Sequence, residues 1–231
     1  MAHRLYPTHI PTSPLQKLLL AGGSALMAIA RPQRGDMVAT MGETTAIRPV
    51  LQRLYDNMAR DEGGQRLLLE RPRITNTSVD RKYLRSLEEG TFGREYERFL
   101  SSLETSPDAR PPVQFIDDAD LVYVMQRYRE THDFTHVVLG MPTTMLGEVT
   151  VKWFEGIQFG LPMCVSGGVF GTLRLGPKHR QRFFSTYMPW VIKQGVNGRF
   201  FLSVEWEKHW ETPLKQLRRQ LNLDPPPTEN S

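Results

Sequence analysis

The chain has 231 residues, of which 39% are hydrophobic and 23% are charged, and its formal net charge is +4. This length and composition suit one substantial globular domain and exclude an intrinsically disordered chain. The positive charge favours anionic lipid headgroups or acidic proteins as partners. No nucleic-acid partner is expected, because the sequence lacks a basic cluster interleaved with aromatic residues.

The first predicted helix contains Pro14 in its first turn, after a cap at Thr12 or Ser13, and ends near Arg31. A Gly22-Gly23 pair interrupts its apolar residues. The segment therefore falls short of the ~20 continuous apolar residues that a membrane span requires.

This first helix is also a predicted membrane contact. Its apolar residues lie beside Lys17, and no acidic residue precedes Asp36. Such a helix would lie in the interface of an anionic bilayer, and the alternative is a helix packed into the core. The acid-free start is typical of mitochondrial targeting regions, but a complete Arg- and Ser-rich leader is missing, so we expect a mature or trimmed form. The apolar residues concerned are Leu15, Leu18, Leu19, Leu26 and Ile29.

Further helix signals continue along the chain, and strands with clean alternation are nearly absent. Helices are predicted over residues 36–41, 47–60, 65–70, 81–87, 92–103, 178–195 and 212–223. Two more helices are predicted between residues 103 and 178: the first starts from a cap at Asp117 or Asp118, and the second runs from Pro142 towards Gly160. Loops are predicted at 75–78 and 107–112, with a glycine-rich passage at 167–171. We therefore predict an all-α fold, a single-domain helical bundle. Residues 1–13 would form an N-terminal arm, 14–223 the helical domain and 224–231 a flexible proline-rich tail.

The single cysteine, Cys164, cannot form an internal disulfide, and its apolar neighbours favour a small buried residue. The sequence also lacks a GxxxxGK[ST] phosphate loop and a GxSxG nucleophile elbow. These observations argue against ordinary NTPase and hydrolase chemistry.

The most informative segment is THDFTHVVLGMPTTMLGE, residues 131–148. His132 and His136 are four residues apart, so on a helix they share one face with ~5–6 Å between their Cβ atoms. Asp133 borders the same face, and Glu148 follows on a second helix after a break at residues 140–142. We predict a metal site across these two consecutive helices. Imidazole and carboxylate ligands suit zinc, iron or another divalent first-row metal.

The two histidines also extend an apolar stripe, which predicts that both are buried. A buried imidazole needs partners for its nitrogens. Without a metal, those partners would be backbone carbonyls and Asp133, while Glu148 would form a salt bridge with Lys152 at i+4. The stripe consists of Leu121, Met125, Tyr128, His132 and His136.

The sequence resembles the ubiquinone (coenzyme Q) biosynthesis family Coq4, whose motif is His-Asp, two residues, His, eleven residues, Glu. Residues 132–148 match this motif without a gap, and the likeness extends to PTSPLQKLLLAGGSA, GREYERFL and EWEKHWE. The resemblance implies a zinc-type site with four ligands. These are His132, Asp133, His136 and Glu148.

The family resemblance also implies an activity. The expected reaction is loss of the C1 carboxylate from a polyprenylated 4-hydroxybenzoate, of the 4-hydroxy-3-methoxy-5-polyprenylbenzoate type, coupled to hydroxylation at C1. The chain would then be a carbon–carbon lyase, a decarboxylase, in which Lys152 can steer the substrate carboxylate toward the ion. The alternative is a non-catalytic, lipid-binding organiser of the enzymes of this pathway.

The implied location is the matrix side of the mitochondrial inner membrane, with peripheral attachment to its lipid surface. The implied partners are the other ubiquinone biosynthesis enzymes, in a multi-subunit complex. A homo-oligomer is left open.

Overall fold

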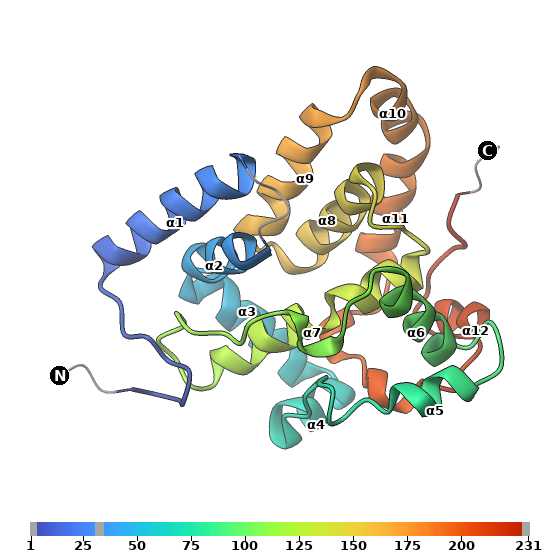
Figure 1. Cartoon of the computed structure of the whole chain (residues 1–231), viewed down its shortest axis with the longest axis horizontal. Coiled ribbons are helices and arrows are strands. Elements are labelled where there is room, and N and C mark those ends of the chain that lie inside the picture. The colour runs from blue at the N-terminus through green and yellow to red at the C-terminus, as the bar shows by residue number, and fades with distance from the viewer. Residues whose placement is uncertain (1–3, 31–34, 228–231) are drawn as a thin grey trace.

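Helices follow one another through the computed structural model, which describes residues 4–30 and 35–227 (Figure 1). The helices are α1 (Pro14–Ala30), α2 (Gly35–Thr45), α3 (Arg48–Arg60), α4 (Glu62–Glu70), α5 (Arg81–Ser86), α6 (Phe92–Ser102), α7 (Leu121–Leu139), α8 (Met145–Phe159), α9 (Pro162–Arg174), α10 (Pro177–Arg182), α11 (Met188–Asn197) and α12 (Leu214–Gln220). Short 3-10 turns occur at η1 (Pro107–Ala109), η3 (Phe201–Ser203) and η4 (Trp206–Lys208), and η2 (Phe183–Tyr187) is a π-helical stretch between α10 and α11. Over the described ranges β-pairing is limited to one isolated bridge, between Thr91 and Pro213. The predicted all-α, single-domain fold is confirmed.

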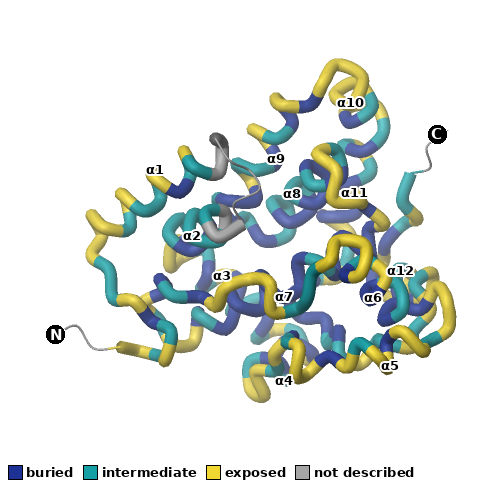
Figure 2. Tube along the Cα trace, viewed as in Figure 1, coloured by how far each residue is buried: buried dark blue, intermediate teal, exposed yellow. Residues whose placement is uncertain are grey.

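Helix α7 forms the centre of the molecule. All its residues are buried except Val122 and Asp133, and Figure 2 shows α7 as a mostly dark trace in the middle of the structure. Helices α3, α6, α8 and α12 pack around it. A helix enclosed on all sides is fixed by many neighbours at once, so its side chains have defined positions.

Several charged side chains of α7 are buried with it, and each has a partner. Arg127 donates to Glu207 and Arg129 donates to Glu43, both at 2.5 Å. Breaking a buried ion pair by removing one partner costs ~3–5 kcal/mol, because the remaining charge stays buried. These pairs therefore fix the rotation of α7 about its axis, and with it the direction of the two histidines.

No helix was predicted over the glycine-rich passage at residues 167–171, but this passage lies inside α9. A Cβ atom at Gly171 would lie 2.6 Å from Val149, and one at Gly168 would lie 3.2 Å from Trp153. The glycines thus let α9 approach α8 closely. This packing compensates for the poor helix propensity of glycine, which costs about 1 kcal/mol per residue relative to alanine.

Most other helices agree with the sequence prediction to within a few residues. The cap residue of α7 is Asp120, and the predicted cap Asp118 lies two residues earlier, where its Oδ1 accepts from the backbone N–H of Leu121 at 3.2 Å. Helix α8 begins after a cap at Thr144 instead of at Pro142, because the Thr144 hydroxyl accepts from Gly147 N. The predicted helix at 178–195 is present as a continuous helical run over 177–197, in which the π-helical stretch η2 joins α10 to α11.

Helix α1 lies at one edge of the molecule and packs chiefly on α2 (Figure 1). Ser24 is its one buried residue among those whose side chains are described, and Leu15, Leu18, Leu19 and Leu26 are exposed. Its predicted end at Arg31 and the side chain of Ile29 lie outside the described residues. In the described ranges, we find no helix with the length and apolar content needed to cross a bilayer.

The start of the predicted tail contacts α11. The carboxylate of Asp224 pairs with Lys193 at 2.7 Å, and Trp190 donates to the carbonyl of Pro225 at 3.0 Å. The last four residues of the tail, 228–231, lie outside the described part of the chain.

Candidate metal centre

Three possible metal ligands converge from two consecutive helices. His132 and His136 of α7 and Glu148 of α8 offer ligand atoms that all lie within 4.8 Å of one another. The Nε2 atom of His136 is 3.4 Å from a Glu148 carboxylate oxygen, and the Nε2 atom of His132 is 3.9 Å from the other. Ligands ~2.0–2.2 Å from a tetrahedral zinc ion are ~3.3–3.6 Å apart, so small side-chain movements would complete the geometry.

The turn between the two helices brings Glu148 to the histidines. Gly140 ends α7 in the left-handed conformation, with φ of 65°, where glycine is favoured because it has no Cβ. The chain then reverses, and the Thr144 cap starts α8 with Glu148 in its first turn. A carboxylate at this position interacts favourably with the positive end of the helix dipole.

The ring of His136 faces the converging ligands, and one of its two nitrogens lacks a hydrogen-bond partner. Its Nδ1 lies 2.9 Å from the carbonyl oxygen of Met141, so Nδ1 carries the proton and donates. Its Nε2 is buried and has no hydrogen-bond partner, although the Glu148 carboxylate is nearby. An unsatisfied buried polar atom costs about 1–3 kcal/mol. A metal ion would satisfy this atom, and the donor set therefore fits the zinc-type site that the family resemblance implies.

Metal ligation requires a carboxylate and neutral imidazoles, and Glu148 and His132 meet this requirement. Burial raises the pKa of Glu148, but His136 and His132 lower it to about 2, so the carboxyl group is ionised. Burial lowers the pKa of His132 and keeps its ring neutral. For His136, burial lowers the pKa, but contact with Glu148 outweighs burial and raises it. A bound cation would displace the proton from Nε2 of His136.

Asp133 does not join the three converging ligands in the structure. Its carboxylate accepts from Nη2 of Arg110 at 2.6 Å, from the loop that precedes α7. Burial raises the pKa of Asp133, but the charge of Arg110 lowers it. Asp133 remains a predicted ligand, and it would have to leave Arg110 to reach the ion.

Lys152 does not pair with Glu148, the partner that its position in the sequence suggested. Its ammonium donates to Glu155 at 2.7 Å and to the hydroxyl of Tyr128 at 3.2 Å. It therefore pairs at i+3 instead of forming the alternative salt bridge with Glu148 at i+4. The prediction that His132 contacts Asp133 in the absence of a metal was also wrong, because Nδ1 of His132 contacts Glu155 instead.

Glu155 is the main residue that sequence reasoning missed. It is fully buried behind His132, where Cys164 and Tyr128 also contact its carboxylate. A signal was present, because Glu155 follows Glu148 by seven residues, which places both on one face of α8. Cys164 is buried as predicted, and burial raises the pKa of its thiol.

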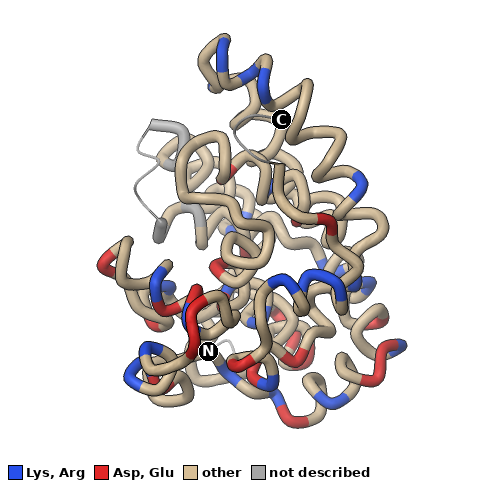
Figure 3. Tube along the Cα trace, turned by 90° about the vertical axis from the view of Figure 1, so that its right-hand side faces the viewer, with Lys and Arg blue, Asp and Glu red and all other residues tan. Residues whose placement is uncertain are grey.

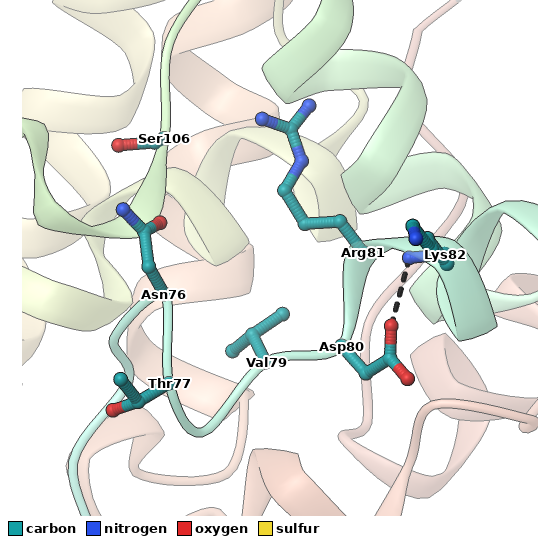
Figure 4. A pocket seen from close by; sticks show the side chains of 7 residues that line it. All are labelled: Asn76, Thr77, Val79, Asp80, Arg81, Lys82 and Ser106. Atoms are coloured by element: carbon teal, nitrogen blue, oxygen red, sulfur yellow. Dashed lines mark hydrogen bonds between the residues drawn. The ribbon is translucent and has the colours of Figure 1, made fainter.

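A separate shallow pocket lies beside the start of α5 and includes no residue of the converging set (Figure 4). Two of its three charged side chains, those of Asp80 and Arg81, are already used within the fold. Asp80 caps α5 by accepting from the N–H of Lys82, and Arg81 pairs with Glu97 at 2.7 Å. We therefore assign this pocket no function.

Several known proteins are similar to this chain. The family described as "Coenzyme Q (ubiquinone) biosynthesis protein Coq4" matches residues 6–227. The mitochondrial ubiquinone biosynthesis protein coq-4 of Caenorhabditis elegans is 56% identical over 97% of each chain. The mitochondrial COQ4 homolog of Homo sapiens is 51% identical over 96% of this chain and 84% of its own length. The crystal structure of a candidate ubiquinone biosynthesis protein from Nostoc punctiforme shares the fold, with a TM-score of 0.72, 21% identity, and coverage of 91% of this chain and 98% of that one.

Proposed function

Because the chain belongs to the family of coenzyme Q (ubiquinone) biosynthesis protein Coq4, we propose that it acts in ubiquinone biosynthesis as a metal-dependent decarboxylase. One observation carries this proposal. His132, His136 and Glu148, at the spacing of the family motif, bring two buried imidazoles and a partly buried carboxylate together. The proposed ion is zinc, with iron or another divalent metal as the alternative.

The proposed substrate is a polyprenylated benzoate of the 4-hydroxy-3-methoxy-5-polyprenylbenzoate type. The bond between ring carbon C1 and the carboxylate carbon breaks, carbon dioxide leaves, and the electron pair stays on the ring. Hydroxylation at C1 takes one atom of dioxygen. The other atom becomes water with two electrons from an external reductant and three protons, counting the proton of the new hydroxyl group.

The residues of the site have defined parts in this proposal. A bound divalent ion supplies Lewis-acid stabilisation of negative charge that develops on the ring. His132, His136 and Glu148 would hold it, with the two imidazoles buried and the Glu148 side chain 39% exposed. Lys152, whose side chain is 14% exposed, is the proposed group that attracts the substrate carboxylate, with its charge partly balanced by Glu155.

Carbon dioxide release tests the proposal directly. Purified protein with zinc or iron, dioxygen, a reductant and a short-tail soluble substrate should release carbon dioxide in stoichiometric amounts. The same preparation treated with a chelator is the control and should release none. If no metal supports release by the folded protein, the decarboxylase proposal fails.

The alternative function is a non-catalytic, lipid-binding organiser of the other ubiquinone biosynthesis enzymes. The apolar side chains exposed on α1 and α9 favour it, because exposed apolar surface commonly marks sites that contact proteins or membranes. On α9 the glycines face α8, and the larger apolar residues face outward. These outward residues are Val165, Val169, Phe170 and Leu173.

We further propose peripheral attachment to the matrix side of the mitochondrial inner membrane, since the relatives are named mitochondrial. Residues 156–204, which include α9 and α10, contain no Asp or Glu but six Lys or Arg. Figure 3 shows this basic character as blue segments at the top of the molecule, where α10 lies. A basic surface with exposed apolar residues suits an anionic bilayer.

We expect α1 to contribute to this attachment. Deleting residues 1–31 should reduce flotation with anionic liposomes, and added salt should reduce flotation of the full chain. Leu19→Ser should weaken flotation, because Leu19 is 67% exposed on α1. Leu69→Ser, at an 84% exposed position on α4, is the matched control and should have no effect. Equal flotation of the deletion variant and the full chain, both folded, would refute a role for α1.

A further inference from the structure

Glu155 makes a short contact with His132, a proposed metal ligand, at the ring nitrogen that faces away from the metal site. Its Oε1 lies 2.6 Å from Nδ1 of His132, on the opposite side of the ring from the Nε2 that faces Glu148. Glu155 is 0% exposed. It lies beyond the end of the family motif, which finishes at Glu148.

The contacts of Glu155 decide which nitrogen of His132 carries the proton. Lys152 Nζ lies 3.4 Å from Nδ1, so Nδ1 has a potential donor as well as an acceptor beside it. The ammonium is closer to Glu155, at 2.7 Å from Oε2, and this pair keeps the carboxylate charged. A carboxylate can only accept, so Nδ1 must donate to Oε1. In the neutral ring, Nε2 is then left with a free lone pair.

We propose that Glu155 is a positioning residue that holds His132 in the Nδ1-protonated tautomer with Nε2 directed at the metal. This inference rests on the proposed function, since it concerns the ion that the site would hold. A carboxylate behind a ligating histidine fixes the orientation of the ring and makes the ligand more basic.

The surroundings of Glu155 keep the carboxylate in place. Oε2 accepts from Lys152 and from the Tyr128 hydroxyl at 3.1 Å, and Cys164 Sγ lies 3.6 Å away. Oε1 is therefore left to His132. The other histidine ligand is backed by a neutral carbonyl, that of Met141, so the carboxylate support is specific to His132.

The tautomer can be measured without any metal. In the metal-free protein, at a pH where the His132 ring is neutral, ¹⁵N NMR of His132 should show a proton on Nδ1 and none on Nε2. A proton on Nε2 with Nδ1 unprotonated would overturn the inference. This readout is independent of the proposed function, because it holds even for a protein that binds no metal and releases no carbon dioxide.

Glu155→Gln tests the consequence for metal binding. An amide has one acceptor oxygen for two strong donors, Lys152 Nζ and His132 Nδ1, so His132 loses its fixed tautomer. Zinc affinity, measured by competition with a chelator, should fall ~10–100-fold, as for other contacts behind metal ligands. The absorption spectrum of the Co²⁺-substituted protein should also change.

Glu97→Gln is the matched control, because Glu97 is also buried and paired, with Arg81 and Arg85, but does not contact the metal residues. It should lower thermal stability and leave zinc affinity unchanged. Wild-type zinc affinity in a folded Glu155→Gln protein would overturn the inference, as would equal losses of affinity in both variants. If Glu155→Gln does not fold, the NMR measurement on the unmodified chain still decides.

Discussion

Replacing His132 or His136 with alanine is expected to reduce bound zinc from about one equivalent per chain to nearly none. Each change removes one of only three converging ligands. Affinity should therefore fall by more than the ~10–100-fold that contacts behind a ligand contribute. Elemental analysis of the purified variants measures the loss.

His179→Ala is the matched control for this experiment. His179 is an exposed residue of α10, outside the converging set, so its removal should leave the metal content unchanged. Chelation should also lower the melting temperature of the unmodified protein, because a ligand bound only by the folded state stabilises that state. A full equivalent of metal retained in both His132→Ala and His136→Ala would show that the ion does not bind here.

Asp133→Asn distinguishes the two possible ligand sets. In the structure, Asp133 pairs with Arg110 and lies outside the converging atoms, so the three-ligand set predicts a small change in metal content. The four-ligand set of the family predicts a loss similar to that of the histidine variants. Measuring all variants side by side assigns the role of Asp133.

The convergence of His132 and His136 was predictable because it depends on local spacing. Two residues four apart on a helix must share a face, and the apolar stripe indicated which face is buried. Gly140 likewise marked the end of α7, since its left-handed conformation is a common helix terminator. The sequence also placed Glu148 at the start of the next helix, but spacing alone does not fix how two helices pack, and the family motif gave further support to Glu148 as a ligand.

The features that sequence reasoning missed depend on contacts between distant residues. Arg110 is 23 residues before Asp133, and nothing in the intervening loop indicates that the two meet. Glu155 meets His132 only because α8 returns alongside α7. The helical state of Gly168 and Gly171 likewise depends on the neighbouring α8, since their intrinsic propensity opposes a helix. In each case tertiary packing, and not the local sequence pattern, determined the structure.

Glu148→Gln is expected to lower the rate of carbon dioxide release by at least ~100-fold. The amide keeps the size of the side chain but removes its negative charge, which weakens its bond to the ion and changes the charge of the site. Losing one preorganised electrostatic group in an active site typically costs ~10²–10³-fold in rate. The Glu148 side chain is 39% exposed, so the fold should tolerate the change. Single-turnover measurements with short-tail substrate follow the rate.

The same variant separates a catalytic metal from a structural one. Glu62→Gln, at an 87% exposed side chain on α4, is the control and should keep the native rate. A catalytic site predicts that Glu148→Gln loses turnover while circular dichroism and liposome binding persist, because α1 and α9 are unchanged. If a metal-depleted, folded protein releases carbon dioxide at the native rate, the ion only joins α7 to α8. If the native protein releases none with metal, dioxygen and reductant supplied, the organiser function replaces the decarboxylase, since the exposed apolar faces of α1 and α9 do not depend on turnover.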